Sequence, residues 1–294
     1  MLDGCAWFDA KQRNLIYRPS PGTVADWKPI TAQDEAFWLD LPPSAAAVPG
    51  TEPQRLRGIW VPQPDPDAPA VLYLHGTFRN VFQNQPKIKA IFDAGFSVLA
   101  IDYRGYGDSS FQLPSEASVH ADAERAWAEF QRRVPDPARR VIYGHSMGSG
   151  AATALAWRHR EEGVKPPPYG ALVLESAFTS MPDIARDHGT VAGWLAPLAT
   201  QHFESLEKIG DIRAPKWFIA GSADDTVPAV HSQRLFDAAR DPRALVLIDG
   251  GRHSRLDKDD PQRYAQAWAE VARTVGDSER RATRPPAPTI EQRR

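Results

Sequence analysis

The sequence predicts a protein of the α/β class, with a mostly parallel central sheet of about eight strands flanked by helices. Two observations lead to this prediction. From residue 69 onward, short apolar runs alternate with longer stretches in which apolar residues recur at helical spacing. The apolar runs also lack polar alternation, as expected for strands that are covered on both faces. Parallel strands with helical crossovers place the loops that follow the strands along one edge of the sheet.

The expected elements follow one another in a regular order. A short antiparallel pair of strands leads into the sheet, and the helical stretches lie between or after the strands that follow. The expected strands cover residues 35–39, 56–61, 70–74, 96–101, 141–143, 171–174, 217–220 and 245–248. The expected helices cover residues 115–133, 147–160, 232–240 and 264–275.

The chain divides into three parts by composition. Residues 1–54 form a loop-rich lead-in segment with the edge strand, and residues 55–277 form the main domain. Residues 278–294 are rich in proline and arginine without an apolar face, so we expect a disordered tail. Within the main domain, residues 176–215 are too long for one crossover helix after the sixth strand. They predict a small helical cap. This cap packs on the edge of the sheet, shapes a pocket over the site, or does both.

Charge and cysteine content exclude several classes of protein. The 294 residues carry 35 Lys and Arg against 37 Asp and Glu, a formal charge of −2, and this lack of a basic excess argues against a nucleic-acid partner. No apolar stretch approaches the roughly 20 residues of a spanning helix, so we expect no membrane span. The single cysteine, Cys5, excludes an intrachain disulfide and a multi-cysteine zinc site.

The sharpest local signal is the sequence Gly-His-Ser-Met-Gly at 144–148, between an expected strand and an expected helix. This placement predicts a nucleophile elbow, a sharp turn that exposes the hydroxyl of Ser146 at the end of the strand. The turn brings the strand and helix backbones so close that a side chain at Gly144 or Gly148 would collide. The alternative interpretation is that Ser146 only caps the helix.

A serine nucleophile needs a base, and the base needs an acid that orients it. His253 follows glycines after the strand 245–248, and Asp224 follows the strand 217–220. Both therefore lie at the same sheet edge as Ser146, and their chain order Ser, Asp, His matches the order expected of this fold. We predict His253 as the base and Asp224 as the acid, with Asp225 as the alternative acid.

The backbone also supplies candidate groups for an oxyanion hole. The amide of Met147 follows the nucleophile directly, and the amide of Thr77 lies in the loop after the strand 70–74. The alternative is that His-Gly at 75–76 is only a strand-ending turn. We expect large apolar side chains to line the substrate pocket, namely Phe78, Phe178, Trp194 and Phe203.

Taken together, these motifs resemble the α/β-hydrolase superfamily over roughly residues 55–273. The matching motifs are Leu-His-Gly at 74–76, Asp-Tyr-Arg-Gly-Tyr-Gly at 102–107, the elbow, Gly-x-x-Asp-x-x-Val-Pro at 221–228 and Gly-x-His at 251–253. The resemblance is to small-capped serine esterases related to acyl-protein thioesterases, and it favours Asp224 as the acid. One departure is Thr77-Phe78 after His-Gly, where relatives usually carry Asn and small residues. We expect this departure to keep the amide donor and to alter the shape of the pocket floor.

The expected function is that of a serine hydrolase that cleaves carboxylic esters or thioesters through an acyl-enzyme intermediate. Such an enzyme acts on a small-molecule acyl substrate and needs no metal or organic cofactor. The alternatives are a serine peptidase of the same fold, which typically carries a large accessory domain, and a non-catalytic ligand-binding protein on this fold.

The N-terminal residues bear on localisation. Gln-Arg-Asn-Leu-Ile-Tyr-Arg-Pro at 12–19 resembles a segment that often follows a membrane or lipid anchor in relatives. Leu-Asp-Gly-Cys at 2–5 resembles a lipoprotein cleavage box, but no apolar region precedes it. We expect a cytoplasmic protein for the chain as given. The alternative is a periplasmic or membrane-anchored lipoprotein, lipidated at Cys5, if the natural precursor includes an upstream signal peptide.

Overall fold

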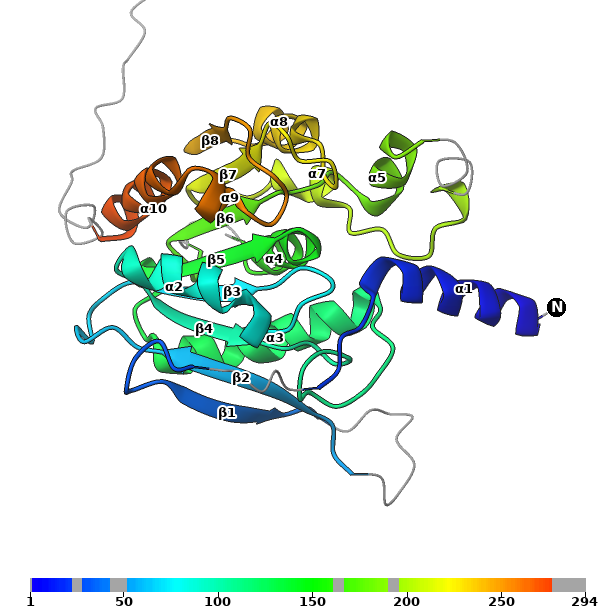
Figure 1. The fold of residues 1–294 in the computed structure, drawn as a ribbon, viewed down its shortest axis with the longest axis horizontal. Coiled ribbons are helices and arrows are strands. Elements are labelled where there is room, and N and C mark those ends of the chain that lie inside the picture. The colour runs from blue at the N-terminus through cyan, green and yellow to red at the C-terminus, as the bar shows by residue number, and fades with distance from the viewer. Residues whose placement is uncertain (1, 23–27, 43–51, 161–166, 190–195, 277–294) are drawn as a thin grey trace, which may run out of the picture.

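A computed structural model describes residues 2–22, 28–42, 52–160, 167–189 and 196–276. Its centre is an eight-stranded sheet with helices on both faces (Figure 1). The strand order is β1-β2-β4-β3-β5-β6-β7-β8, in which β2 pairs antiparallel with β1 and β4 and all other neighbours are parallel. The strands are β1 (Glu35–Asp40), β2 (Arg55–Val61), β3 (Ala70–Leu74), β4 (Ser97–Ile101), β5 (Arg140–His145), β6 (Ala171–Glu175), β7 (Lys216–Gly221) and β8 (Arg243–Ile248).

The described helices connect and cover these strands. The α-helices are α1 (Leu2–Tyr17), α2 (Gln85–Asp93), α3 (Glu116–Arg133), α4 (Met147–Arg158), α5 (Met181–Asp187), α7 (Ser205–Ile209), α8 (Ala229–Ala238), α9 (Leu256–Asp259) and α10 (Pro261–Gly276). Single 3-10 turns are η1 (Phe82–Asn84), η2 (Pro137–Arg139) and η3 (Ala196–Leu198). The predicted α/β class and all eight expected strands are confirmed.

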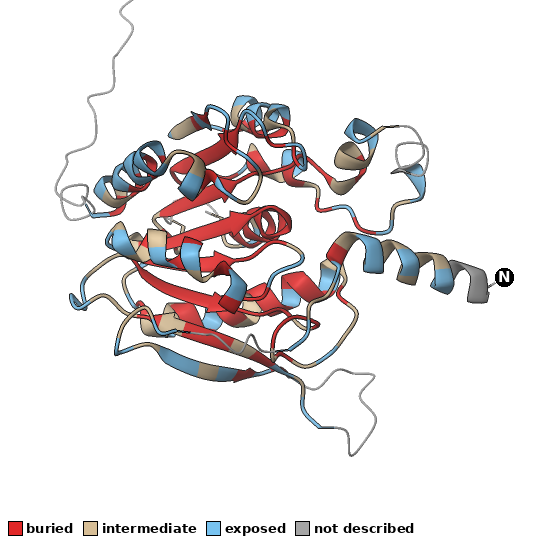
Figure 2. Ribbon diagram, in the orientation of Figure 1, coloured by how far each residue is buried: buried red, intermediate tan, exposed pale blue. Residues whose placement is uncertain are grey.

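The central strands are buried on both faces, which explains why their sequences lack polar alternation (Figure 2). On β3, Leu72 belongs to the apolar core that contains Ala151 of α4. Its neighbour Val71 belongs to the core on the other face, with Ile88 of α2 and Trp268 of α10. Two helical layers therefore enclose the sheet, and the loops after the parallel strands gather at one edge.

The N-terminal segment differs from its expected loop-rich character, because residues 2–17 form helix α1. Good helix formers occupy its middle, and Asp9 pairs with Arg13 one turn later, at 3.2 Å. The edge strand expected within this segment is β1. Cys5 lies in the first turns of α1. The expected disordered tail lies outside the described residues.

The chain between β6 and β7 contains α5, η3 and α7, in the region where the sequence predicts a cap. Figure 1 shows α5 and α1 standing out from the same side of the sheet. Two segments that lie more than 160 residues apart in the sequence thus border the edge at which the candidate site lies.

Candidate active site

The turn between β5 and α4 has the geometry of a nucleophile elbow. Ser146 has φ 53° and ψ −124°, a strained conformation for a residue with a side chain. A Cβ atom on Gly144 would lie 2.1 Å from the carbonyl oxygen of Gly148, so the two backbones do approach as closely as the sequence suggests. Ser146 occupies the N-cap position of α4, but its side chain makes no capping hydrogen bond to that helix.

The loops after β7 and β8 bring Asp224 and His253 to Ser146. The Nε2 atom of His253 lies 3.0 Å from the Oγ atom of Ser146, and its Nδ1 atom lies 2.8 Å from Oδ2 of Asp224. The chain of contacts therefore has the serine, imidazole and carboxylate in sequence, each at hydrogen-bonding distance from the next. Geometrically, such a chain can carry a proton from the serine hydroxyl to the ring while the carboxylate fixes the ring's orientation.

The surroundings of Asp224 stabilise the ionised form of its carboxyl group. Burial disfavours its charged form, but the contact with His253 and the amides of Val227 and Thr226 outweigh that cost, so the pKa of Asp224 lies below its ordinary value. These two amides donate to Oδ1 over 2.8 and 3.0 Å. The neighbouring Asp225 is exposed, and the described carboxylate contact of His253 Nδ1 is with Asp224 rather than with Asp225.

Two further side chains hold the His253 loop in place. The Nε2 atom of His145 lies 3.2 Å from the backbone carbonyl of His253, which can only accept, and the hydroxyl of Ser176 donates to the same oxygen over 3.2 Å. Burial, with Lys87 and His253 nearby, holds the pKa of His145 well below its ordinary value, so this ring is neutral. The backbone and the ring of His253 are thus fixed by separate contacts.

A buried polar cluster that the sequence analysis missed lies beneath the elbow. The carboxylate of Glu175 forms an ion pair with Lys87 and accepts hydrogen bonds from the hydroxyls of Tyr143 and Tyr264, over 2.7 and 2.9 Å. Its backbone carbonyl accepts the amide of Ser146 over 3.0 Å. The sequence signal was a single glutamate at the end of an otherwise apolar strand.

Ser146 borders a cavity of about 750 Å³ with a mostly apolar lining. One wall comes from α5 and another from α1, which the sequence analysis did not place near the site. His188, just after α5, contacts the carbonyl of Thr226 over 2.7 Å and so ties the cap region to the loop that carries Asp224. The lining residues include Phe8, Leu15, Ile16, Met181, Ile184 and Val227.

The structure places the other expected site residues as follows. Thr77 and Met147 line the cavity beside Ser146, and so do Phe78 and Phe178. Gly76 approaches the elbow so closely that an added Cβ would lie 3.0 Å from Cβ of Ser146, so the loop that carries Thr77 does reach the elbow.

The expectation for Phe203 requires a correction. Phe203 does not line the described cavity. It is 2% exposed and packs in the core against the rings of Tyr17 and Phe178. Gly150 makes room for it, because a Cβ there would lie 2.7 Å from the Phe203 ring. Trp194 lies outside the described residues.

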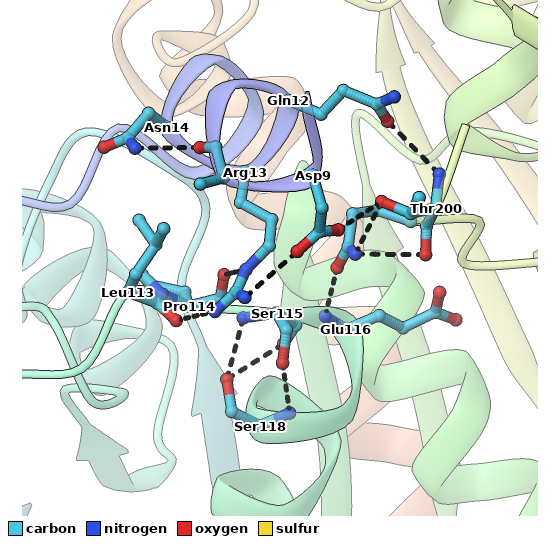
Figure 3. Close-up of polar contacts among 12 residues, drawn as sticks. Asp9, Gln12, Arg13, Asn14, Leu113, Pro114, Ser115, Glu116, Ser118 and Thr200 are labelled. Atoms are coloured by element: carbon cyan, nitrogen blue, oxygen red, sulfur yellow. Dashed lines mark hydrogen bonds and ion pairs between the residues drawn. The ribbon is translucent and has the colours of Figure 1, made fainter. Parts of the chain in front are cut away.

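Polar contacts attach α1 to two distant segments (Figure 3). Arg13 donates to the carbonyl oxygens of Leu113 and Pro114, the latter over 2.8 Å. On the other side, Gln12 donates to the carbonyl of Leu198 over 2.9 Å and accepts the amide of Thr200 over 3.2 Å. The wall that α1 contributes is therefore attached on both sides, to the loop before α3 and to the end of η3 with the residues that follow it.

Comparisons with known proteins agree with this architecture. A family profile described as serine aminopeptidase, S33, matches residues 65–205. An uncharacterized protein of Mycobacterium tuberculosis is 36% identical over 251 residues, which cover 83% of this chain and 81% of that protein. The zebrafish (Danio rerio) lysophosphatidylserine lipase ABHD12 is 31% identical over 191 residues, or 60% of this chain and 49% of that protein.

Among solved structures, an esterase of Pyrococcus furiosus superposes with a TM-score of 0.65 at 18% identity, over 88% of this chain and 97% of that one. No helix in the described parts of the chain combines the length and the apolar character needed to cross a bilayer. The sheet order, the sequence relatives and the matched profile lead to one conclusion: the chain belongs to the α/β-hydrolase superfamily, the fold of many esterases and lipases.

Proposed function

We propose that this protein is a serine hydrolase that cleaves carboxylic esters or thioesters through an acyl-enzyme intermediate. The observation that carries the proposal is the contact chain from Asp224 through His253 to Ser146, which ends at the wall of a large apolar cavity. A nucleophile, its base and an orienting acid are the three groups that acyl transfer requires.

In the first half of the reaction, the Oγ atom of Ser146 attacks the carbonyl carbon of the substrate while Nε2 of His253 takes the hydroxyl proton. The backbone amides of Thr77 and Met147 donate to the oxyanion of the tetrahedral intermediate. The intermediate collapses as the bond to the leaving group breaks, and His253 returns the proton to the departing alcohol or thiol. Ser146 then carries the acyl group as an ester.

In the second half, His253 takes a proton from a water molecule while the water oxygen attacks the carbonyl carbon of the acyl group that is bound to Ser146. The same amides hold the oxyanion. Collapse releases the carboxylic acid and returns the proton to Ser146. Asp224 stays ionised throughout and stabilises the imidazolium that forms in each half.

The cavity favours an acyl chain as the bound part of the substrate. Its volume of about 750 Å³ and its lining by residues such as Ile16, Phe178 and Ile184 suit an extended hydrocarbon chain. The similarity to a protein named as a lysophosphatidylserine lipase supports an ester of a single-chain lipid as the substrate class.

The test is hydrolysis of p-nitrophenyl esters from acetate to palmitate by the wild type and by Ser146→Ala, with a fluorophosphonate probe as a second readout. We expect activity and labelling in the wild type and neither in Ser146→Ala. Ser222→Ala is the matched control, because this exposed serine follows β7 at the same edge and contacts Asp249 rather than His253. A wild type that hydrolyses no ester and takes no label would contradict the proposal and favour a non-catalytic binding protein.

A serine peptidase is the second candidate, favoured by the matching profile described as serine aminopeptidase. An aminopeptidase needs an acidic group for the substrate's amino terminus, and Asp225 is the one carboxylate among the described lining residues. Aminoacyl p-nitroanilides test this candidate directly. Their cleavage at rates above those of the esters would replace the esterase assignment.

A further inference from the structure

Four large, exposed apolar side chains lie in the segments that border the cavity. Leu15 and Phe78 line the cavity, yet they are 69% and 53% exposed. Trp7, about two turns before Leu15 on α1, is 64% exposed, and Leu198, whose carbonyl accepts from Gln12, is 57% exposed. Scattered single apolar residues are normal on a surface, but a group around an opening indicates an interaction site. We name these four residues, Trp7, Leu15, Phe78 and Leu198, the rim.

Two cations lie directly against the aromatic members of the rim. The Nζ atom of Lys11 is 5.7 Å from the ring centre of Trp7, and the guanidinium carbon of Arg18 is 4.4 Å from that of Phe78. Among the described residues, no carboxylate forms an ion pair with either cation. The nearby acid Asp9 is paired with Arg13, and Asp225 is the one described carboxylate that lines the cavity.

We propose that the rim docks on an anionic lipid bilayer and opens the cavity toward it. Exposed Trp and Leu with adjacent Lys and Arg are the pattern of surfaces that lie in the headgroup region, where rings enter the acyl boundary and cations meet anionic lipid. In Figure 2 exposed residues alternate with half-buried ones along α1, so the helix can lie against a bilayer without unfolding. The docked helix lies on the membrane rather than across it.

This inference rests on the proposed function, because docking places the cavity mouth where acyl substrates are dissolved. A single-chain lipid would move from the bilayer past Leu15 and Phe78 to Ser146 without crossing water. A second copy of the chain fits the rim less well. In a two-fold interface the same patch of both chains meets, which would bring the Lys11 and Arg18 cations of both copies together.

The experiment measures co-sedimentation with phosphatidylcholine vesicles, with and without phosphatidylglycerol. The full chain with Ser146→Ala is used so that the lipids stay intact. In this background Trp7→Ser/Leu198→Ser removes two rim residues that do not line the described cavity. The matched control is Trp38→Ser/Leu247→Ser, because these residues are 39% and 49% exposed on β1 and β8, the two outer strands of the sheet.

We expect binding to the anionic vesicles, a loss of at least about tenfold in affinity for the rim variant, and little change for the control. Lys11→Glu should weaken binding to anionic vesicles and leave binding to neutral ones unchanged. With Ser146 restored, the rim variant should hydrolyse p-nitrophenyl acetate as the wild type does, which shows that it folds.

Three results would overturn the proposal. The Ser146→Ala protein could stay in the supernatant with both vesicle types, or the rim variant could bind vesicles as well as the protein with an intact rim. The third result is a protein that binds no vesicles but forms a dimer, with the rim variant monomeric. Failure of the proposed function is a separate result, because it appears as absent ester hydrolysis by the wild type whatever the vesicles show.

Discussion

Gly148, in the first turn of α4, lies against the end of β3, so that a Cβ atom on it would be 2.0 Å from the carbonyl oxygen of Leu74. The atom that such a Cβ would meet belongs to the backbone rather than to a flexible side chain, so it cannot move aside without shifting a strand or a helix. The close approach fixes the elbow relative to the strand that precedes the Thr77 loop. The nucleophile and the proposed oxyanion donors are thereby held in one rigid unit.

Gly148→Ala should therefore reduce the free energy of unfolding by about 1–3 kcal/mol, because overpacking forces the backbone to move. Urea unfolding measures the change. Gly276→Ala at the end of α10 is the control, since nothing lies within 4 Å of a Cβ there. Equal stability of Gly148→Ala and the wild type would show that the elbow is less constrained than this contact implies.

Asp224→Asn should lower kcat by roughly 10⁴-fold, because the neutral amide cannot stabilise the His253 imidazolium or hold the productive tautomer. The Asn side chain can still accept from Thr226 and Val227, so the fold should survive. Steady-state ester hydrolysis and circular dichroism test the two parts. For Asp225→Asn we expect a much smaller loss, and the reverse ranking would assign the acid to Asp225.

Arg13→Ala should affect long substrates selectively. It removes the contacts to Leu113, Pro114 and Asp9, which loosens the α1 wall of the cavity. We expect KM for p-nitrophenyl dodecanoate to rise by about tenfold while the acetate ester is hydrolysed as before.

The control for Arg13→Ala is Arg125→Ala, because Arg125 also donates to a backbone carbonyl, that of Asp40 over 2.9 Å, on a different part of the surface. A similar rise in KM for acetate and dodecanoate would contradict the role of α1 as a wall for the chain.

Asp102 should make stability depend on pH. Its carboxylate is buried and accepts the amide of Val81 over 2.7 Å, and burial, with Asp108 nearby, raises the pKa of Asp102 to about 7 from its ordinary 3.8. The pKa of Asp102 is therefore higher in the folded protein than in the unfolded chain. Its contribution to the free energy of unfolding is fully present below about pH 4 and is lost as pH rises through about 7.

Asp102→Asn lacks this titration and keeps an acceptor for Val81. The variant should therefore gain stability relative to the wild type as pH rises between these values, by at most about 1.4 kcal/mol per pH unit. Urea unfolding of both proteins at acidic and alkaline pH measures this. Parallel pH profiles would show that Asp102 titrates normally in the folded protein.

The sequence was sufficient for features that depend on local pattern. Each apolar run is a strand because a strand covered on both faces needs no polar residue, and the elbow is recognisable because glycines are required where two backbones meet. The positions of Asp224 and His253 after successive strands follow from the parallel topology. For these reasons the sheet and the contacts among the three side chains could be predicted together.

Features that depend on distant partners could not be predicted. Helix α1 is attached through Arg13 to a carbonyl 101 positions away and through Gln12 to one 186 positions away. Phe203 is a core residue because Gly150 leaves space for its ring, and Glu175 is buried because Lys87, 88 positions earlier, neutralises it. Spacing along the chain carries no information on such pairings.

The attachment of α1 has a consequence for how this scaffold can change. The groups that would break and form bonds stand on loops of the sheet, whereas a large part of the wall that would measure the acyl chain comes from one continuous segment of 16 residues. Exchanging that segment for another helix can alter which chains fit without disturbing a single strand. Substrate range and bond chemistry can therefore diverge independently in descendants of this protein.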